Sequence, residues 1–129
     1  MKLYDTPLAP NPRRVRMFLA EKGIDFPREE INLIEGGAKT EGFSRLNPMQ
    51  SVPVLVLDDG FALSETIAIC RYVEEALKPE PNLFGRNPRE RAEIEMWNRR
   101  VELKLFLPQT KRYRNTIRWF QISRRNGEL

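Results

Sequence analysis

Apolar and polar positions along the first part of the chain follow two different periods. Residues 1–4 form a short apolar run, which predicts a first strand. In residues 12–22 the apolar positions recur three and four residues apart, as on one face of a helix, while polar residues such as Lys22 fill the other face. Asn11 is a favourable N-cap before this helix, and Gly23 is a favourable C′ residue after it. The pattern therefore predicts a strand followed by a helix.

The next stretch predicts mainly β-structure. Residues 26–34 indicate a second strand, near an edge of the sheet because Pro27 cannot donate a ladder hydrogen bond. A polar loop then leads to a short helix around residues 40–46. Two apolar runs within residues 51–64 flank the turn sequence DDG at positions 58–60, which predicts a β-hairpin.

A third helical stripe follows the hairpin and completes one domain. It covers residues 64–77, with Ser64 as a natural N-cap and Glu65 complementing the positive end of the helix. The order is then strand, helix, strand, helix, strand, strand, helix. A βαβ half followed by a ββα half makes an α/β fold, a small mixed sheet with helices on its faces. We expect this thioredoxin-like layout over residues 1–78.

A change in composition separates this domain from the rest of the chain. The Pro- and Gly-containing segment 79–87 predicts a linker. The sequence NPRE at its end combines an N-cap, a proline in the first helical turn and a glutamate three positions after the cap. An apolar stripe continues from there and is expected to stop at Pro108. We expect a partial all-helical domain over residues 88–129.

The residue types present exclude several kinds of chemistry. The 129-residue chain has no histidine, which removes zinc sites of the usual kind and the Ser-His and Cys-His triads, so no metal site is expected. Its single cysteine, Cys70, excludes an internal disulfide and is expected to be a buried structural thiol. The start of the sequence lacks the apolar region of a secretory signal, and no apolar run is long enough to span a membrane. A reducing, cytoplasmic setting is the simplest expectation.

Charge is distributed unevenly. Residues 1–80 carry ten Lys and Arg against thirteen Asp and Glu, whereas residues 81–129 carry twelve against five. The basic tail interleaves aromatic residues with its cations, a composition that can hold nucleic acid, but no nucleic-acid motif accompanies it. We therefore assign the tail to the helical domain and expect no nucleic-acid partner. The arginines of the sequence NPRRVR either form a solvated helix face or attract an anionic ligand.

Two short segments carry candidate binding chemistry. Pro53 begins a strand whose pattern is typical of a central strand, where proline would remove a ladder hydrogen bond. A cis Val52–Pro53 bond in a turn before the strand would resolve this conflict. An edge strand that begins with a trans proline is the alternative. A cis bond would expose the main chain of Val52 to an extended peptide. In the second segment, Glu65 and Thr66 at a helix start match the amine and the carboxylate of an α-amino acid head. Ordinary helix capping is the alternative for this pair.

The two segments together carry a family resemblance. NPMQSVPVLVLDDGFALSETIAICRYVEE, supported by PNPRRVRMFLAEKGI, resembles the N-terminal domain of glutathione S-transferases over residues 1–77. NPRERAEIEMWNRRVE resembles the first long helix of that family's helical domain. The resemblance implies glutathione as co-substrate, attack of its thiolate on a small apolar electrophile, and a homodimer. A non-catalytic binding or assembly module is the alternative function.

The resemblance also implies a role for particular residues. The main chain of Val52 would hold the cysteinyl part of glutathione, with Pro53 as the cis proline. Glu65 and Thr66 would bind the γ-glutamyl head. Lys39 lies in the loop that often contacts the glycyl carboxylate.

Two positions depart from the family's pattern. Gln50 stands where many relatives have glycine. The Ser or Cys that activates the thiol in many relatives falls at Ala9, which donates no side-chain hydrogen bond. Thr6 and Asn11 are the nearby donors, and Tyr4 and either Arg13 or Arg14 are further candidates. We expect Asn11, by its side chain or its backbone, to stabilise the thiolate. A hydrogen bond to a charged group would lower the thiol pKa by about one to two units.

Overall fold

The computed structural model describes residues 1–7 and 9–116. Contacts within the chain divide it into two compact units, residues 1–83 and residues 84–129, with the break inside the segment 79–87.

A four-stranded mixed sheet forms the centre of the first unit, in the order β2-β1-β3-β4. Its strands are β1 (Lys2–Asp5), β2 (Arg28–Glu30), β3 (Val54–Val56) and β4 (Ala62–Ser64). β1 runs parallel to β2, and β3 is antiparallel to both β1 and β4. This is the thioredoxin-like layout that the order of elements predicts, with β2 at an edge as Pro27 indicates.

β2 is shorter than the strand expected over residues 26–34. The side-chain oxygen of Asn32 accepts hydrogen bonds from the N–H groups of Ile34 (3.1 Å) and Glu35 (3.3 Å), which turns the chain away from the sheet. An asparagine side chain competes in this way with a strand ladder.

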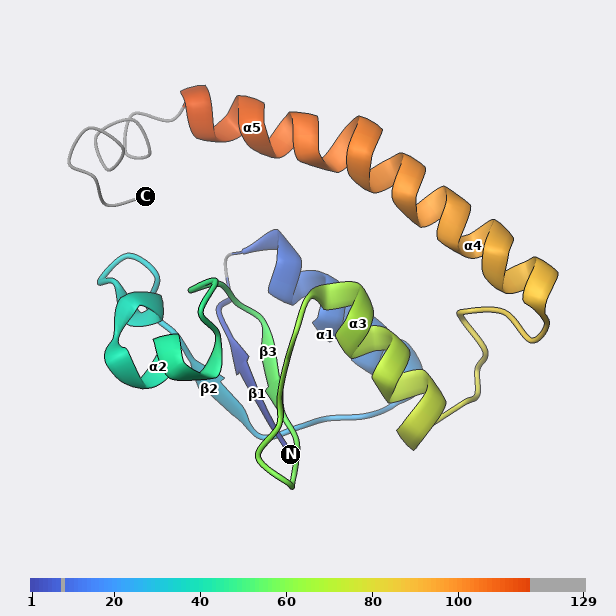
Figure 1. The fold of residues 1–129 in the computed structure, drawn as a ribbon, viewed down its shortest axis with the longest axis horizontal. Helices are drawn as coiled ribbons and strands as arrows, with labels where there is room; N and C mark the ends of the chain where they lie inside the picture. Colours follow the sequence, from blue (N-terminus) through green and yellow to red (C-terminus); the bar gives the residue numbers. More distant parts are fainter. Residues whose placement is uncertain (8, 117–129) are drawn as a thin grey trace. The chain divides into compact units, whose positions relative to one another are not determined.

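Helices cover both faces of the sheet. They are α1 (Pro10–Lys22), the short 3₁₀ turn η1 (Gly37–Lys39), α2 (Glu41–Leu46) and α3 (Thr66–Tyr72), which continues into the π-helical turn η2 (Val73–Leu77). α1 and α3 lie side by side on one face, and α2 lies on the other (Figure 1). Thr40 caps α2 by accepting a hydrogen bond from the N–H of Phe43.

The two faces of the sheet hold separate parts of the core, because successive strand residues point to opposite sides. Leu3 and Leu55 are partners across β1 and β3 and are fully buried on the α1 and α3 side. On the α2 side, Tyr4 packs its ring edge-on against the ring of Phe43 at 5.9 Å. The buried cluster there is Ile31, Ala38, Phe43, Val52 and Val54.

Two expected helix caps are wrong by one or two positions. α1 begins at Pro10 with Ala9 as N-cap, so Asn11 lies in the first turn and does not cap it. Proline has the backbone angle of a helix already set, which favours this earlier start. Ser64 pairs with Val54 and ends β4, so Glu65 occupies the N-cap position of α3.

The second unit is helical from Pro88 to Thr116, where its described part ends. It contains α4 (Pro88–Val101), the π-helical turn η3 (Glu102–Phe106) and α5 (Leu107–Thr116). The helix expected to stop at Pro108 instead continues through it, because the preceding π-helical turn already interrupts the regular hydrogen-bond ladder that proline would break. No described helix is long and apolar enough to cross a membrane. The end of the basic tail, residues 117–129, lies outside the described residues.

Candidate functional site

The strand register brings the two candidate segments to one end of the sheet. The ladder between β3 and β4 starts with Val54 opposite Ser64. Residues 52–53, just before β3, and residues 65–66, just after β4, therefore lie next to each other. Thr6 follows β1 at the same end, because β1 pairs with the same end of β3.

The Val52–Pro53 peptide bond is cis, which decides between the two alternatives that the sequence left open. The Val52 side chain is 7% exposed and belongs to the buried cluster on the α2 side of the sheet. Its main chain lies ahead of the first ladder pair of β3. An extended peptide can pair with main-chain groups in such a position.

Glu65 connects β4 to α3 in an unusual backbone conformation. Its φ is +70° and its ψ is 122°, while its side chain is exposed. A residue other than glycine held in such a sparsely populated region costs about 1–3 kcal/mol, and such residues cluster at ligand sites. An exposed carboxylate here can meet an ammonium group.

Thr66, the first residue of α3, is bound by an arginine from α1. Arg14 Nη1 donates to Thr66 Oγ1 at 2.6 Å, and Thr66 is 7% exposed. The expectation of a solvated helix face is therefore wrong for Arg14 and holds for the exposed Arg13.

A second arginine of α1 fixes the turn between β1 and α1. Arg16 Nη1 donates to Asp5 Oδ1 at 2.7 Å and to the carbonyl of Thr6 at 3.1 Å, and Arg16 Nη2 donates to the carbonyl of Pro7 at 3.0 Å. The Asp5 carboxylate is buried, and Thr6 is 8% exposed. The Arg16 guanidinium therefore stabilises the turn and is not directed to a ligand. Sequence reasoning missed both arginine contacts, since neither partner falls within the same local pattern.

The first turn of α1 offers one backbone donor. Its first three residues are Pro10, Asn11 and Pro12, and proline has no N–H group. The N–H of Asn11 is therefore the donor at the positive end of this helix. The Asn11 side chain is exposed and makes no hydrogen bond to any residue that the structure describes. At Ala9 there is no side-chain donor, and its carbonyl accepts from the N–H of Arg13 at 3.3 Å.

Lys39 and Gln50 lie in the segments on the α2 side. Lys39 is exposed at the end of η1, directly after Ala38, which packs in the same buried cluster as Val52. Gln50 has a φ of +52°, in the left-handed region that favours glycine. A glycine at this position would adopt this conformation without strain.

Cys70 is buried in α3, as the sequence predicts. Burial raises the pKa of its thiol to about 12, although the positive charge of Arg14 acts in the opposite direction. The neutral thiol is a poor nucleophile. Among the described residues there is no group of three or more Cys, Asp or Glu that could hold a metal ion.

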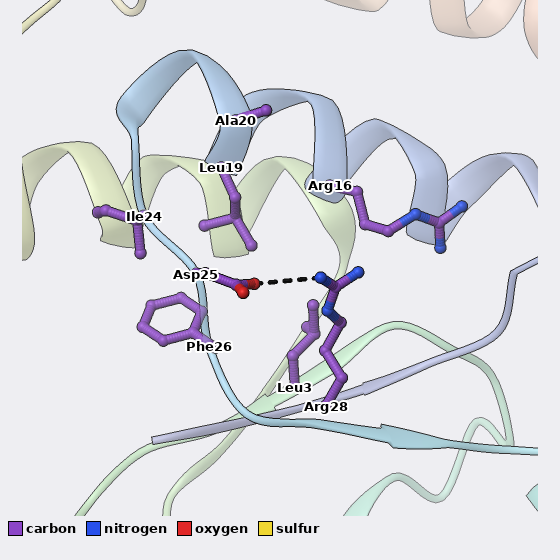
Figure 2. Close-up of a pocket in the computed structure, with 8 residues that line it drawn as sticks. All are labelled: Leu3, Arg16, Leu19, Ala20, Ile24, Asp25, Phe26 and Arg28. Carbon is purple, nitrogen blue, oxygen red and sulfur yellow. Dashed lines mark hydrogen bonds and ion pairs between the residues drawn. The ribbon is translucent and has the colours of Figure 1, made fainter.

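A cavity of about 240 Å³ lies elsewhere in this unit, between α1 and the edge of the sheet (Figure 2). Leu3, Leu19 and Phe26 are among its apolar walls, and an ion pair between Asp25 and Arg28 spans it at 3.2 Å. None of the candidate site residues lines this cavity.

The chain was compared with protein-family models and with known proteins, and the matches agree on one family. Residues 9–76 match the family model described as the glutathione S-transferase N-terminal domain. Glutathione S-transferase 2 of Saccharomyces cerevisiae is 45% identical over 112 residues, covering 84% of this chain and 47% of that protein. Maleylacetoacetate isomerase of Mus musculus is 45% identical over 85 residues, covering 64% of this chain and 38% of that protein. The chain thus spans less than half the length of these two relatives.

Solved structures agree with the sequence matches. The crystal structure of Gtt2 from Saccharomyces cerevisiae superposes with a TM-score of 0.75 at 44% identity, covering 80% of this chain and 50% of that one. A glutathione S-transferase domain-containing protein from Marinobacter aquaeolei gives a TM-score of 0.76 at 42% identity, covering 79% and 50%.

Proposed function

Since the chain belongs to the glutathione S-transferase family, we propose that it binds glutathione at the sheet end described above and promotes attack of the glutathione thiolate on a small apolar electrophile. The observation that carries this proposal is the strand register, which places the main chain of Val52 beside Glu65 and Thr66. One ligand can then contact both the main-chain groups that pair with an extended peptide and the side chains that bind an amino acid head.

Each part of glutathione has a matching group. The main chain of Val52 pairs with the cysteinyl residue, Glu65 meets the ammonium of the γ-glutamyl head, and the hydroxyl of Thr66 meets its carboxylate. Lys39 attracts the glycyl carboxylate at the other end of the peptide. Opposite charges are thereby matched at the ammonium group and at the glycyl carboxylate, at the two ends of the ligand.

The chemical step requires a stabilised thiolate. The thiol loses its proton to solvent, and the sulfur then forms a bond to an electrophilic carbon of the second substrate, whose leaving group departs with the electron pair. The proposal assigns thiolate stabilisation to Asn11, with Thr6 as a further hydroxyl beside the same turn. One hydrogen bond to the charged sulfur, helped by the helix end, lowers the thiol pKa by about one to two units.

A non-catalytic glutathione-binding module is the second candidate, and Ala9 favours it. Alanine at the activating position leaves the thiolate without a side-chain donor from that residue. The chain also spans less than half of its relatives, so a homodimer and an electrophile site belong to the proposal and its test. A cytoplasmic setting fits a chain whose co-substrate is itself a thiol.

Calorimetric titration with glutathione and conjugation of a chloro-dinitroarene separate the two candidates. Binding with turnover supports the transferase, and binding without turnover supports the module. The absence of both would overturn the glutathione assignment.

The role of Asn11 is tested by a matched pair of variants. Asn11→Ala removes the side chain and keeps the N–H, whereas Asn11→Pro also removes the N–H and is compatible with a first helical turn. The pKa of bound glutathione, followed by thiolate absorbance, rises by about one to two units in the variant that loses the active donor. Asn98→Ala in α4 serves as the control. An unchanged pKa in both Asn11 variants would exclude Asn11 from the mechanism.

A further inference from the structure

The contact between Arg14 and Thr66 joins two helices at the edge of the proposed glutathione site. Arg14 lies in the second turn of α1, and its guanidinium donates to Thr66 Oγ1 at 2.6 Å. Thr66 and Cys70 are four residues apart and share one face of α3. The positive charge of Arg14 also acts to lower the pKa of the Cys70 thiol, against the larger effect of burial.

This contact determines whether the threonine hydroxyl donates or accepts the next hydrogen bond. A hydroxyl has one proton to donate and two lone pairs to accept with. Because Arg14 occupies an acceptor position on Oγ1, the hydroxyl proton is directed to another partner. A hydroxyl polarised by a cation donates more strongly to an anion than an isolated hydroxyl does.

We propose that Arg14 is a positioning residue that makes the site selective for γ-glutamyl compounds with a free α-carboxylate, by orienting the Thr66 hydroxyl proton toward that carboxylate. The inference rests on the proposed function, since it requires that the γ-glutamyl head bind at Glu65 and Thr66. This role distinguishes Arg14 from its neighbour Arg13, which belongs to the same sequence pattern.

The test compares glutathione with its analogue in which the α-carboxylate of the γ-glutamyl residue is a neutral amide. Dissociation constants for both ligands are measured by calorimetry on the full chain, its Arg14→Gln variant and its Arg14→Lys variant. Arg13→Gln is the matched control, because it removes the same charge from the adjacent exposed position. Circular dichroism of each variant reports whether the fold is retained.

The expected result is a loss of discrimination. The dissociation constant of the amide analogue divided by that of glutathione measures the discrimination. This ratio falls about tenfold in Arg14→Gln, as expected when a charge-assisted hydrogen bond is exchanged for a neutral one. The affinity for the amide analogue stays within about twofold, Arg14→Lys keeps part of the ratio, and Arg13→Gln keeps all of it. An equal loss of affinity for both ligands in Arg14→Gln would assign Arg14 a structural role and overturn the inference.

A second measurement keeps the inference testable if Arg14→Gln does not fold. Thr66→Val alone then abolishes the discrimination, and in a folded Arg14→Lys background it removes only the part that Arg14→Lys had kept, because the two residues act through one hydroxyl. Full additivity of the two losses would contradict the inference. Failure of the unaltered chain to bind glutathione would instead overturn the proposed function, and this inference with it.

Discussion

Lys22 and Glu74 form an ion pair inside the first unit, with their side chains 0% and 4% exposed and Nζ 2.9 Å from Oε2. Lys22 Nζ also donates to the carbonyls of Pro79 and Pro81, and Glu74 Oε2 accepts from the N–H of Leu83 at 2.8 Å. The pair therefore ties the segment after η2 to α1. A buried ion pair is tolerated when its remaining hydrogen-bonding positions are satisfied, whereas a single buried charge without its partner is strongly destabilising.

Removal of one partner is expected to destabilise the first unit strongly. Lys22→Met leaves the Glu74 carboxylate buried without its cation, which lowers the free energy of unfolding by about 3–5 kcal/mol. Urea unfolding followed by circular dichroism measures the change. Lys22→Met combined with Glu74→Gln restores part of the stability, since no charge is then left buried.

The control for this pair is an exposed one. Arg45 and Glu41 pair on α2 with side chains 78% and 81% exposed, so Arg45→Met changes the free energy of unfolding by less than about 1 kcal/mol. Equal effects of Lys22→Met and Arg45→Met would show that burial of the Lys22 pair has no energetic weight.

Cys70 is expected to make stability fall at high pH. Its pKa is raised from the ordinary 9.0 to about 12 in the folded chain, so the unfolded state releases the thiol proton first. The resulting stability is fully present below pH 9.0 and is lost as the pH rises toward about 12. Unfolding of the unaltered chain and of Cys70→Ala across this range measures the effect, and the unaltered chain should lose more stability. Parallel losses in the two proteins would mean that Cys70 does not contribute.

The same burial predicts low reactivity of the Cys70 thiol. Iodoacetamide should leave it unmodified in the folded chain at neutral pH and modify it in urea, as mass spectrometry would show. Rapid modification of the folded chain would contradict the buried, protonated state.

Replacement of Gln50 by glycine is expected to stabilise the first unit. Its φ of +52° strains a residue with a Cβ atom, so Gln50→Gly raises the free energy of unfolding by up to about 1 kcal/mol, after the greater freedom of glycine in the unfolded chain is subtracted. Met49→Gly, at an exposed neighbour with an ordinary φ, should lower it by about 0.5–1 kcal/mol. Effects of the same sign at both positions would exclude strain at Gln50.

The start of α4 depends on a reciprocal cap. Asn87 Oδ1 accepts from the N–H of Glu90 at 2.9 Å, and Glu90 Oε2 accepts from the N–H of Arg86 at 2.8 Å. Asn87→Ala should destabilise the first turn by about 1 kcal/mol and accelerate amide hydrogen exchange there. The mid-helix change Asn98→Ala should leave that exchange unaltered. Similar acceleration by both variants would argue against the cap.

Local patterns predicted most of the fold because their causes are local. The αL glycine after α1 and the Asn87 cap of α4 are each set by residues a few positions apart. The isomer of the Val52–Pro53 bond, which is cis in the structure, stays open in the sequence because the two forms of an X–Pro bond are close in free energy.

Contacts distant in sequence explain what the patterns missed. Lys22 was placed on the polar face of α1, yet its partner Glu74 lies on another helix. Arg14 reaches Thr66 across 52 positions of sequence, and no local period encodes such a pair. The strand pairing of Ser64 likewise prevailed over its preference as a cap.

The alternation of prolines around Asn11 has a practical consequence for spectroscopy. A backbone amide spectrum records one signal for each N–H group, and Pro10 and Pro12 give none. The Asn11 resonance is therefore a single built-in reporter for the start of α1. A ligand atom that arrives there would shift that signal, and neither of the two adjacent residues contributes a backbone amide signal.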